Sequence, residues 1–243
     1  YKVDEVLQRA KENRIERIVT IGTTVADSRD AVAMASKYPQ VYAAIGVHPH
    51  DAGEFNYKDL GILEKLAEDR KVLAIGEIGL DFYRNLSAKD AQTEVVSAMI
   101  DLAVSDNLPI IIHSREAAME TAQVLENILE DKEHPILFHC FSGEQSLIDW
   151  AIARKNVMFS FAGNVTYPKA VQLHEALAQL SPEQIFIETD CPYLAPVPKS
   201  GKENEPSYIV HTAEYVCNAK NISMKKLEEQ LEINFQRFFT LHA

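Results

Sequence analysis

Seven short, continuous apolar runs rich in Ile and Val alternate along this chain with segments of helical periodicity. The runs lie at 17–22, 41–47, 72–76, 109–112, 136–138, 157–161 and 185–188. Unbroken apolar character is typical of parallel strands that are covered on both faces. Seven evenly spaced strand–helix units without a linker predict an α/β fold with a single domain over residues 1–243. The predicted architecture is a (β/α)8 TIM barrel that lacks its first strand in this chain.

The helices between these strands are predicted from apolar spacing and from helix-start signals. Helical segments are expected near 27–37, 57–69, 206–219 and 223–239. Ser87-Ala88-Lys89-Asp90 resembles a capping box that opens another helix. A doubly wound open sheet also alternates strands and helices, but no GxGxxG or GxxxxGK[ST] motif follows any strand. This absence disfavours dinucleotide and P-loop nucleotide binding.

Composition excludes several classes of protein. The chain has 243 residues and is 47% hydrophobic, which argues against disorder. No window of about 18 apolar residues is present, so no membrane span is expected. The formal charge of −12 argues against nucleic-acid binding driven mainly by counterion release. Three cysteines without CxxC spacing indicate a reducing compartment, and we therefore predict a cytoplasmic location. No obligate protein partner is inferred from the sequence.

Imidazoles and carboxylates follow several of the predicted strands. The residues concerned are His48 and His50, Glu77, His113, His139, Glu188 and Asp190. The carboxyl ends of barrel strands meet at one rim, so we expect these side chains to gather there. Imidazole with carboxylate is the ligand set of open, catalytic zinc, manganese or iron sites, and with more oxygen of magnesium sites. A carboxylate such as Glu77 could bridge two ions.

Five ordered motifs then match a known family. They are GVHPH at 46–50, GEIGLDF at 76–82, HSR at 113–115, HCFSG at 139–143 and ETDCPYLAP at 188–196, and GKENEP at 201–206 extends the match. Together they resemble the TatD family of metal-dependent deoxyribonucleases, which are amidohydrolase-like TIM barrels. The resemblance implies a phosphodiesterase that uses metal-bound hydroxide to remove nucleotides from single-stranded DNA or from frayed ends.

The resemblance also implies a role for particular residues. Glu77 would be shared between two divalent ions (Mg, Mn or Zn), His113 and His139 would bind one of them, and Asp190 would bind the other ion or position its water. We therefore expect Asp190 and Glu77 to be the catalytic residues, with Asp190 accepting a proton from the attacking water.

A second group of residues is expected to contact the substrate, which would be DNA or another phosphodiester. The group comprises His48, His50, Arg115, Ser142 and Lys202. Arg115 and Ser142 stand where helices are predicted to begin, a common place for phosphate oxygens. Arg115 could equally pair with a carboxylate. Asp81 is expected to orient a ligand histidine or to anchor a loop.

Two departures from the family pattern affect these expectations. Many relatives carry two arginines in the stretch corresponding to 199–206, where this chain has Ser200 and Glu203 with Lys199 and Lys202 nearby. The family also opens with a strand that ends in a His-x-His metal pair, whereas residues 1–16 resemble the helix that follows that strand. We expect the natural protein to extend N-terminally by one strand and a short loop, about ten to twenty residues.

Two other functions remain open at this point. An amidohydrolase acting on a small cyclic amide would suit the fold and the ligand types. It is disfavoured because Glu77, and not a lysine that could be carbamylated, stands at the strand end. A catalytically degenerate barrel is the other alternative, because the His-x-His pair is absent.

Overall fold

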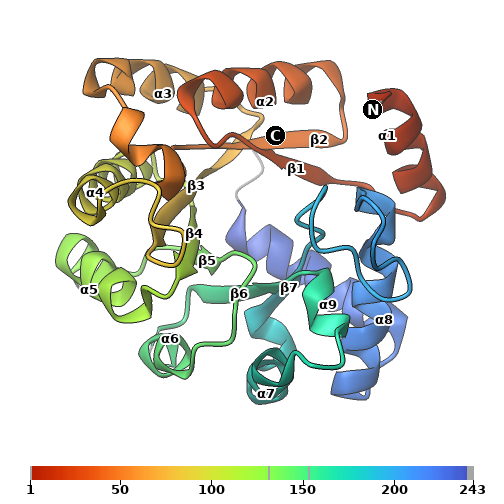
Figure 1. Cartoon of the computed structure of the whole chain (residues 1–243). Coiled ribbons are helices and arrows are strands. Elements are labelled where there is room, and N and C mark those ends of the chain that lie inside the picture. Colours follow the sequence, from red (N-terminus) through yellow and green to blue (C-terminus); the bar gives the residue numbers. More distant parts are fainter. Residues whose placement is uncertain (1, 131, 153, 240–243) are drawn as a thin grey trace. The chain divides into compact units, whose positions relative to one another are not determined.

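Strands at all seven predicted positions form the frame of the structure (Figure 1), a computed structural model that describes residues 2–130, 132–152 and 154–239. The strands are β1 (Ile18–Ile21), β2 (Val41–Ile45), β3 (Val72–Asp81), β4 (Ile110–Arg115), β5 (Ile136–Phe138), β6 (Val157–Phe161) and β7 (Ile185–Ile187). β2 pairs with β3, β3 with β4, β4 with β5 and β6 with β7, and each of these pairs is parallel. The predicted α/β class is therefore confirmed.

Helices alternate with the strands, as the apolar spacing predicts. They are α1 (Val3–Glu12), α2 (Val25–Lys37), α3 (Leu60–Ala67), α4 (Lys89–Ser105), α5 (Ala118–Leu129), α6 (Gln145–Ala151), α7 (Val171–Gln179), α8 (Ile209–Lys220) and α9 (Met224–Phe238). Thr24 caps α2 by accepting a hydrogen bond from the Asp27 amide. No helix among the described residues combines the length and the apolar character that crossing a membrane requires.

The chain separates into two compact units. The first, here called the Glu77 unit, contains Val19–His139, Ser146–Val157 and Phe238–Ala243. The second, here called the Asp190 unit, contains Tyr1–Ile18, Cys140–Gln145 and Met158–Arg237. The single domain over 1–243 stays a prediction.

The Glu77 unit is built on strands β2 to β5, which pair in chain order. Ile45 pairs with Ile75 of β3, Ile75 pairs with Ile110 of β4, and Ile110 pairs with Ile136 of β5. Helix α4 packs on β3 and buries Val95, Met99 and Ile100. Removing these apolar side chains from water contributes favourably to the stability of this unit.

Strand β3 is longer than the sequence predicts. The apolar run suggested an end at Gly76, but the strand continues to Asp81 and all ten of its residues are buried. Its register with β4 shifts between Ile75 and Ile78, which is the stretch that contains Glu77. A shift of this kind re-aims a side chain without ending the strand. Glu77 therefore lies within β3 and not after it, and His113 likewise lies within β4.

Two glycines allow β3 and β4 to approach closely. A Cβ on Gly76 would lie 2.5 Å from Ile111 Cβ, and one on Gly79 would lie 1.9 Å from the His113 carbonyl oxygen. Gly79 also has a φ of +142°, which side-chain-bearing residues rarely adopt. The two glycines of the GEIG motif thus bring β3 close to β4 at Ile111 and at His113, on either side of Glu77 in the sequence.

The predicted capping box at 87–90 is wrong. Helix α4 begins at Lys89, and its N-cap residue Ala88 makes no side-chain cap. The Ser87 hydroxyl instead donates to the His50 carbonyl oxygen and accepts from the Gly53 amide. Ser87 therefore anchors the short 3-10 helix η1 (Pro49–Glu54), because this loop offers it both a donor and an acceptor.

The Asp190 unit contains the parallel pair β6 and β7, in which Ser160 pairs with Phe186. Helix α9 is tied to the start of β7 by Asn234, whose amide donates to the Ile185 carbonyl. Helix α1 is tied to the 199–206 loop by Arg9, which binds both carboxylate oxygens of buried Glu205 at 2.6–2.9 Å. A bidentate pair of this kind holds a loop in one geometry.

Candidate metal centre

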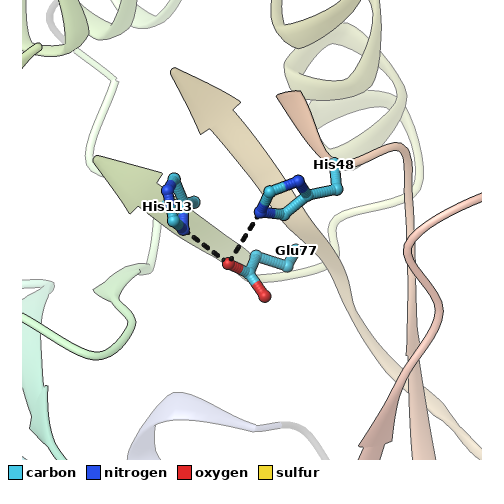
Figure 2. A group of neighbouring side chains, drawn as sticks. All are labelled: His48, Glu77 and His113. Carbon is cyan, nitrogen blue, oxygen red and sulfur yellow. Dashed lines mark hydrogen bonds and ion pairs between the residues drawn. The ribbon is translucent and has the colours of Figure 1, made fainter. Parts of the chain in front are cut away.

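Three imidazoles of the Glu77 unit approach one oxygen of Glu77. His113 Nδ1 lies 2.7 Å from Glu77 Oε1, and His48 Nε2 and His139 Nε2 each lie 3.5 Å from the same atom. Figure 2 shows His48 and His113 pointing at this oxygen, the latter from a neighbouring strand. The side chains of Glu77, His48 and His139 are each only 11% exposed.

The hydrogen bonds of His48 fix which of its ring nitrogens carries a proton. The His50 backbone amide donates to His48 Nδ1 at 3.1 Å, so Nδ1 is an acceptor. In the neutral ring the proton is then on Nε2, the atom that faces Glu77. In this tautomer His48 Nε2 is a hydrogen-bond donor, although His48, Glu77 and His113 place ligand atoms within 4.8 Å of one another.

His113 is held between two carboxylates. Its Nδ1 faces Glu77, and its Nε2 lies 3.3 Å from Asp81 Oδ2. The same Asp81 oxygen lies 2.8 Å from His50 Nε2, and Asp81 Oδ1 accepts from the Arg84 amide. Asp81 is fully buried and contacts both histidine rings, so it holds each ring in one orientation. This is the arrangement in which a carboxylate orients a ligand histidine and leaves its other nitrogen for an ion.

Charge accumulates at this site in a way that shifts three pKa values. Burial by itself raises the pKa of Glu77, but the charge of His139 and hydrogen bonds from His113 and His48 hold that pKa well below its usual range. Burial also raises the pKa of Asp81, but hydrogen bonds from His113, the Arg84 amide and His50 outweigh burial and lower that pKa. Burial lowers the pKa of His113, and hydrogen bonds to Asp81 and Glu77 more than compensate and raise it.

The donor set suits a divalent cation. One carboxylate oxygen has about two lone pairs to share, whereas three imidazole nitrogens converge on Glu77 Oε1. Imidazole nitrogens and carboxylate oxygens are the ligands that zinc and manganese prefer in catalytic sites. The residues present therefore fit a metal ion beside Glu77.

The predicted substrate residues of this unit lie close to the same place. His50 contacts Asp81, as described above. Arg115 lies two residues beyond His113, and its guanidinium carbon sits 4.1 Å above the centroid of the Tyr83 ring. Sequence reasoning left Arg115 open between phosphate and a carboxylate and did not consider Tyr83, although Tyr83 follows Asp81 by only two positions.

Asp190, Ser142 and Lys202 belong to the Asp190 unit. Asp190 follows β7 and has a φ of +53°. The amide of buried Asn204 donates to the carbonyl oxygens of Thr189 and Tyr193, which flank Asp190. The Ser142 hydroxyl donates to Glu144, and Lys202 is exposed in a turn in which its amide bonds to the Lys199 carbonyl.

Sequence reasoning did not foresee two features of this unit. The Cys140 amide donates to Glu188 Oε1 at 2.6 Å, so Glu188 holds the turn after β5. The GKENEP motif acts through Asn204 and Glu205, and not only through its lysine, because both side chains are buried and bonded. A bonded, buried amide in a loop cannot be identified from sequence, since its partners lie 11 and 15 positions away.

Comparison with known proteins gives a consistent result. A family model described as TatD related DNase matches residues 1–240. The uncharacterized metal-dependent hydrolase YabD of Bacillus subtilis (strain 168) is 37% identical over 240 residues, covering 99% of this chain and 93% of that protein. The 3'-5' ssDNA/RNA exonuclease TatD of Pantoea ananatis (strain LMG 20103) is 33% identical over 244 residues, covering 98% and 93%.

Solved structures agree with the sequence comparison. The crystal structure of YJJV, a TatD homologue from Escherichia coli K12, matches with a TM-score of 0.88 at 25% identity and covers 99% of this chain and 92% of that one. This match supports the barrel type of α/β fold that the strand–helix alternation predicts. The chain belongs to the TatD-related DNase family.

Proposed function

We propose that this protein is a divalent-metal-dependent phosphodiesterase that removes nucleotides from the ends of single-stranded DNA. The observation that carries the proposal is the convergence of three imidazole nitrogens on Glu77 Oε1 within a buried site. The name of the relative from Pantoea ananatis, a ssDNA/RNA exonuclease, supports the substrate class. We also propose a cytoplasmic location, since none of the three cysteines, all within the described residues, forms a disulfide.

Glu77, His113 and His139 would hold an ion in the Glu77 unit, and Asp190 remains a proposed metal ligand. We propose two ions of the Mg, Mn or Zn type, with Glu77 shared between them. When bound, such ions supply Lewis acidity and make a water molecule a better nucleophile at neutral pH.

The residues of the chain would then divide the work by their hydrogen-bonding states. His48 would donate from Nε2 to a phosphate oxygen, since its Nδ1 is occupied by the His50 amide. His50 and Asp81 would keep His113 in one ring orientation. Asp190 would accept the proton that the attacking water loses. His50, Arg115, Ser142 and Lys202 remain proposed substrate contacts.

Metal binding tests the proposal independently of catalysis. Titration calorimetry of chelator-treated protein with Mn²⁺ or Zn²⁺ should show binding, and Glu77→Gln should weaken it by about 100-fold or more, since even residues behind the ligands cost 10- to 100-fold. Glu64→Gln, an exposed carboxylate on α3, is the matched control and should bind normally. Unchanged affinity in Glu77→Gln would contradict the assignment.

Turnover distinguishes the proposal from the remaining alternatives. The metal-loaded protein should hydrolyse single-stranded DNA and an aryl phosphodiester, and should leave a dihydroorotate-type cyclic amide intact. Cleavage of the amide alone would establish the amidohydrolase function. A protein that binds metal yet turns over none of the three would support the degenerate barrel.

A further inference from the structure

Tyr83 is an exposed aromatic side chain two residues beyond Asp81, at the end of β3. It is 55% exposed, although a large aromatic residue usually buries most of its surface. One face of its ring carries the Arg115 guanidinium, 4.1 Å from the centroid. At this separation the cation is attracted to the ring electrons. The pair therefore presents an exposed aromatic surface with a positive charge beside it.

Strand pairing places this pair next to the metal ligands. Asp81 pairs with Arg115 and Gly79 pairs with His113, and the Phe82 amide donates to the Arg115 carbonyl oxygen. Side chains two residues apart in a strand share a face, so Arg115 lies on the His113 side of β4. The separation along the strand is about 6.6 Å. Tyr83 follows at the same end of β3, two residues beyond Asp81.

We infer that Tyr83 stacks a nucleobase of a single-stranded substrate while Arg115 binds an adjacent phosphate. The inference rests on the proposed phosphodiesterase function and specifies its substrate: a single-stranded nucleic acid, recognised by one unpaired base next to the cleaved bond. An aromatic face with an arginine beside it meets both parts of one nucleotide, its flat base and its charged phosphate.

The charge of the whole chain supports recognition by a local platform, which here means the Tyr83 ring with Arg115 beside it. A formal charge of −12 provides no broad attraction for nucleic acid. Binding then depends on stacking, which is independent of net charge, and on a few positioned cations. A base within a duplex is already stacked on both sides, so the platform selects unpaired ends.

Kinetics with two substrates test the role of Tyr83. Tyr83→Ala should raise KM for a short single-stranded oligonucleotide by about tenfold, the loss expected for one stacked base, with little change in kcat. The ratio of kcat/KM for the oligonucleotide to that for an aryl phosphodiester, which has no base, should fall by the same factor. Tyr83→Phe should restore it, because the ring remains. Tyr57→Ala, a 49% exposed tyrosine on the 3-10 helix η2 (Tyr57–Asp59), is the matched control and should change neither substrate.

A modified substrate makes the test specific for stacking. A single abasic nucleotide is moved through the terminal positions of the oligonucleotide. At one position the abasic site should raise the KM of the wild-type protein about tenfold. It should not raise the KM of Tyr83→Ala any further, because the ring and the base act as one pair. Equal losses in both proteins at every position would overturn the inference.

The role of Arg115 is tested by salt dependence. The logarithm of oligonucleotide affinity should fall with the logarithm of salt concentration less steeply in Arg115→Gln, by about 0.7 for one lost phosphate contact. An unchanged slope would overturn this part of the inference.

Failure of the inference and failure of the proposed function give different results. If the wild type cleaves both substrates and Tyr83→Ala matches it on both, the platform is wrong and the phosphodiesterase stands. If the metal-loaded wild type cleaves neither, both are wrong.

Discussion

At the scale of single residues, hydrogen-bond geometry separates the histidines around Glu77 into two kinds. His48 has its Nδ1 occupied by a backbone amide, so it is a donor through Nε2. His113 has carboxylates on both sides, so without a metal it is stabilised as an imidazolium. A metal ion would replace that proton on one nitrogen, since a ligand imidazole must be deprotonated there. The same residue therefore favours a proton or a metal ion, but not both.

This exchange predicts how the stability of the metal-depleted protein depends on pH. The pKa of His113 is raised above its unfolded value of 6.5, so its contribution is fully present below pH 6.5 and is lost as the pH rises through the folded value. The pKa values of Glu77 and Asp81 are lowered. Their contributions to stability are therefore present above pH 4.5 and pH 3.8, respectively, and are lost only in stronger acid. The difference in thermal midpoint between wild type and His113→Gln should therefore be largest between about pH 4.5 and 6.5.

Metal affinity should change with pH in the opposite direction. It should rise as the pH increases towards the raised pKa of His113, because protons then compete less. Calorimetry with Mn²⁺ at several pH values measures this, and repetition in buffers of different ionisation enthalpy detects the released proton. An affinity that is flat from pH 5 to 8 would show that His113 is not a ligand.

At the scale of elements, the loop at 199–206 supports the segment after β7. Asn204 donates to the carbonyl oxygens on either side of Asp190, at 2.8 Å to Thr189 and 2.6 Å to Tyr193. Glu205 joins the same loop to α1 through Arg9, and hydrogen bonds from Arg9 lower its pKa. The loop therefore holds the backbone around Asp190, a proposed catalytic residue, in place. The sequence does not reveal this role, because the loop lies several residues away from Asp190 along the chain.

Replacing Asn204 by alanine should damage both stability and catalysis. Two carbonyl oxygens would lose their donor, which costs about 1–3 kcal/mol in the free energy of unfolding. We expect kcat to fall by more than KM changes, because Asn204 positions Asp190 without contacting the substrate. Urea unfolding and steady-state kinetics on an aryl phosphodiester measure the two effects. Asn218→Ala, an exposed asparagine on α8, is the control. Wild-type kcat in Asn204→Ala would exclude the positioning role.

At the scale of the whole molecule, charge and site geometry impose opposite conditions on a nucleic-acid substrate. Thirty-six acidic side chains against 24 basic ones repel a polyanion. The candidate site gathers imidazoles around Glu77, and Arg115 lies two residues beyond His113 on β4. A substrate would therefore be held at few positions, where metal ions and local cations offset the overall repulsion.

Single strands should consequently bind better than duplexes of the same sequence. A duplex carries twice the phosphate density, and no base at its paired positions is available for stacking. We expect an affinity for blunt duplex DNA about tenfold lower than for the single strand. Fluorescence anisotropy at moderate salt, with ends blocked against cleavage, measures both. Equal affinities would point to groove binding and against recognition at the ends.

Much of the fold was accessible from the amino-acid sequence. Apolar runs such as 136–138 and 157–161 predicted β5 and β6 with their observed bounds, because burial on both faces requires continuous apolar residues. β3 was predicted too short, since polar Glu77 interrupts its apolar run and the strand continues past it through a register shift. That shift depends on the neighbouring strand, and local sequence carries no sign of it.

The candidate site, like the fold, was predicted from the sequence only in part. The sequence by itself determined which residue types follow the strands, and so which side chains could meet: His48, Glu77, His113 and His139 gather as predicted. Only the tertiary structure decided that all three imidazoles face one oxygen, that a backbone amide occupies His48 Nδ1, and that Arg115 lies over Tyr83. The first and the third are contacts a few ångströms long between side chains on different strands or loops, and the second depends on the turn that the chain makes at His48. Such contacts depend on register and on side-chain direction, which are set only when the strands pack together.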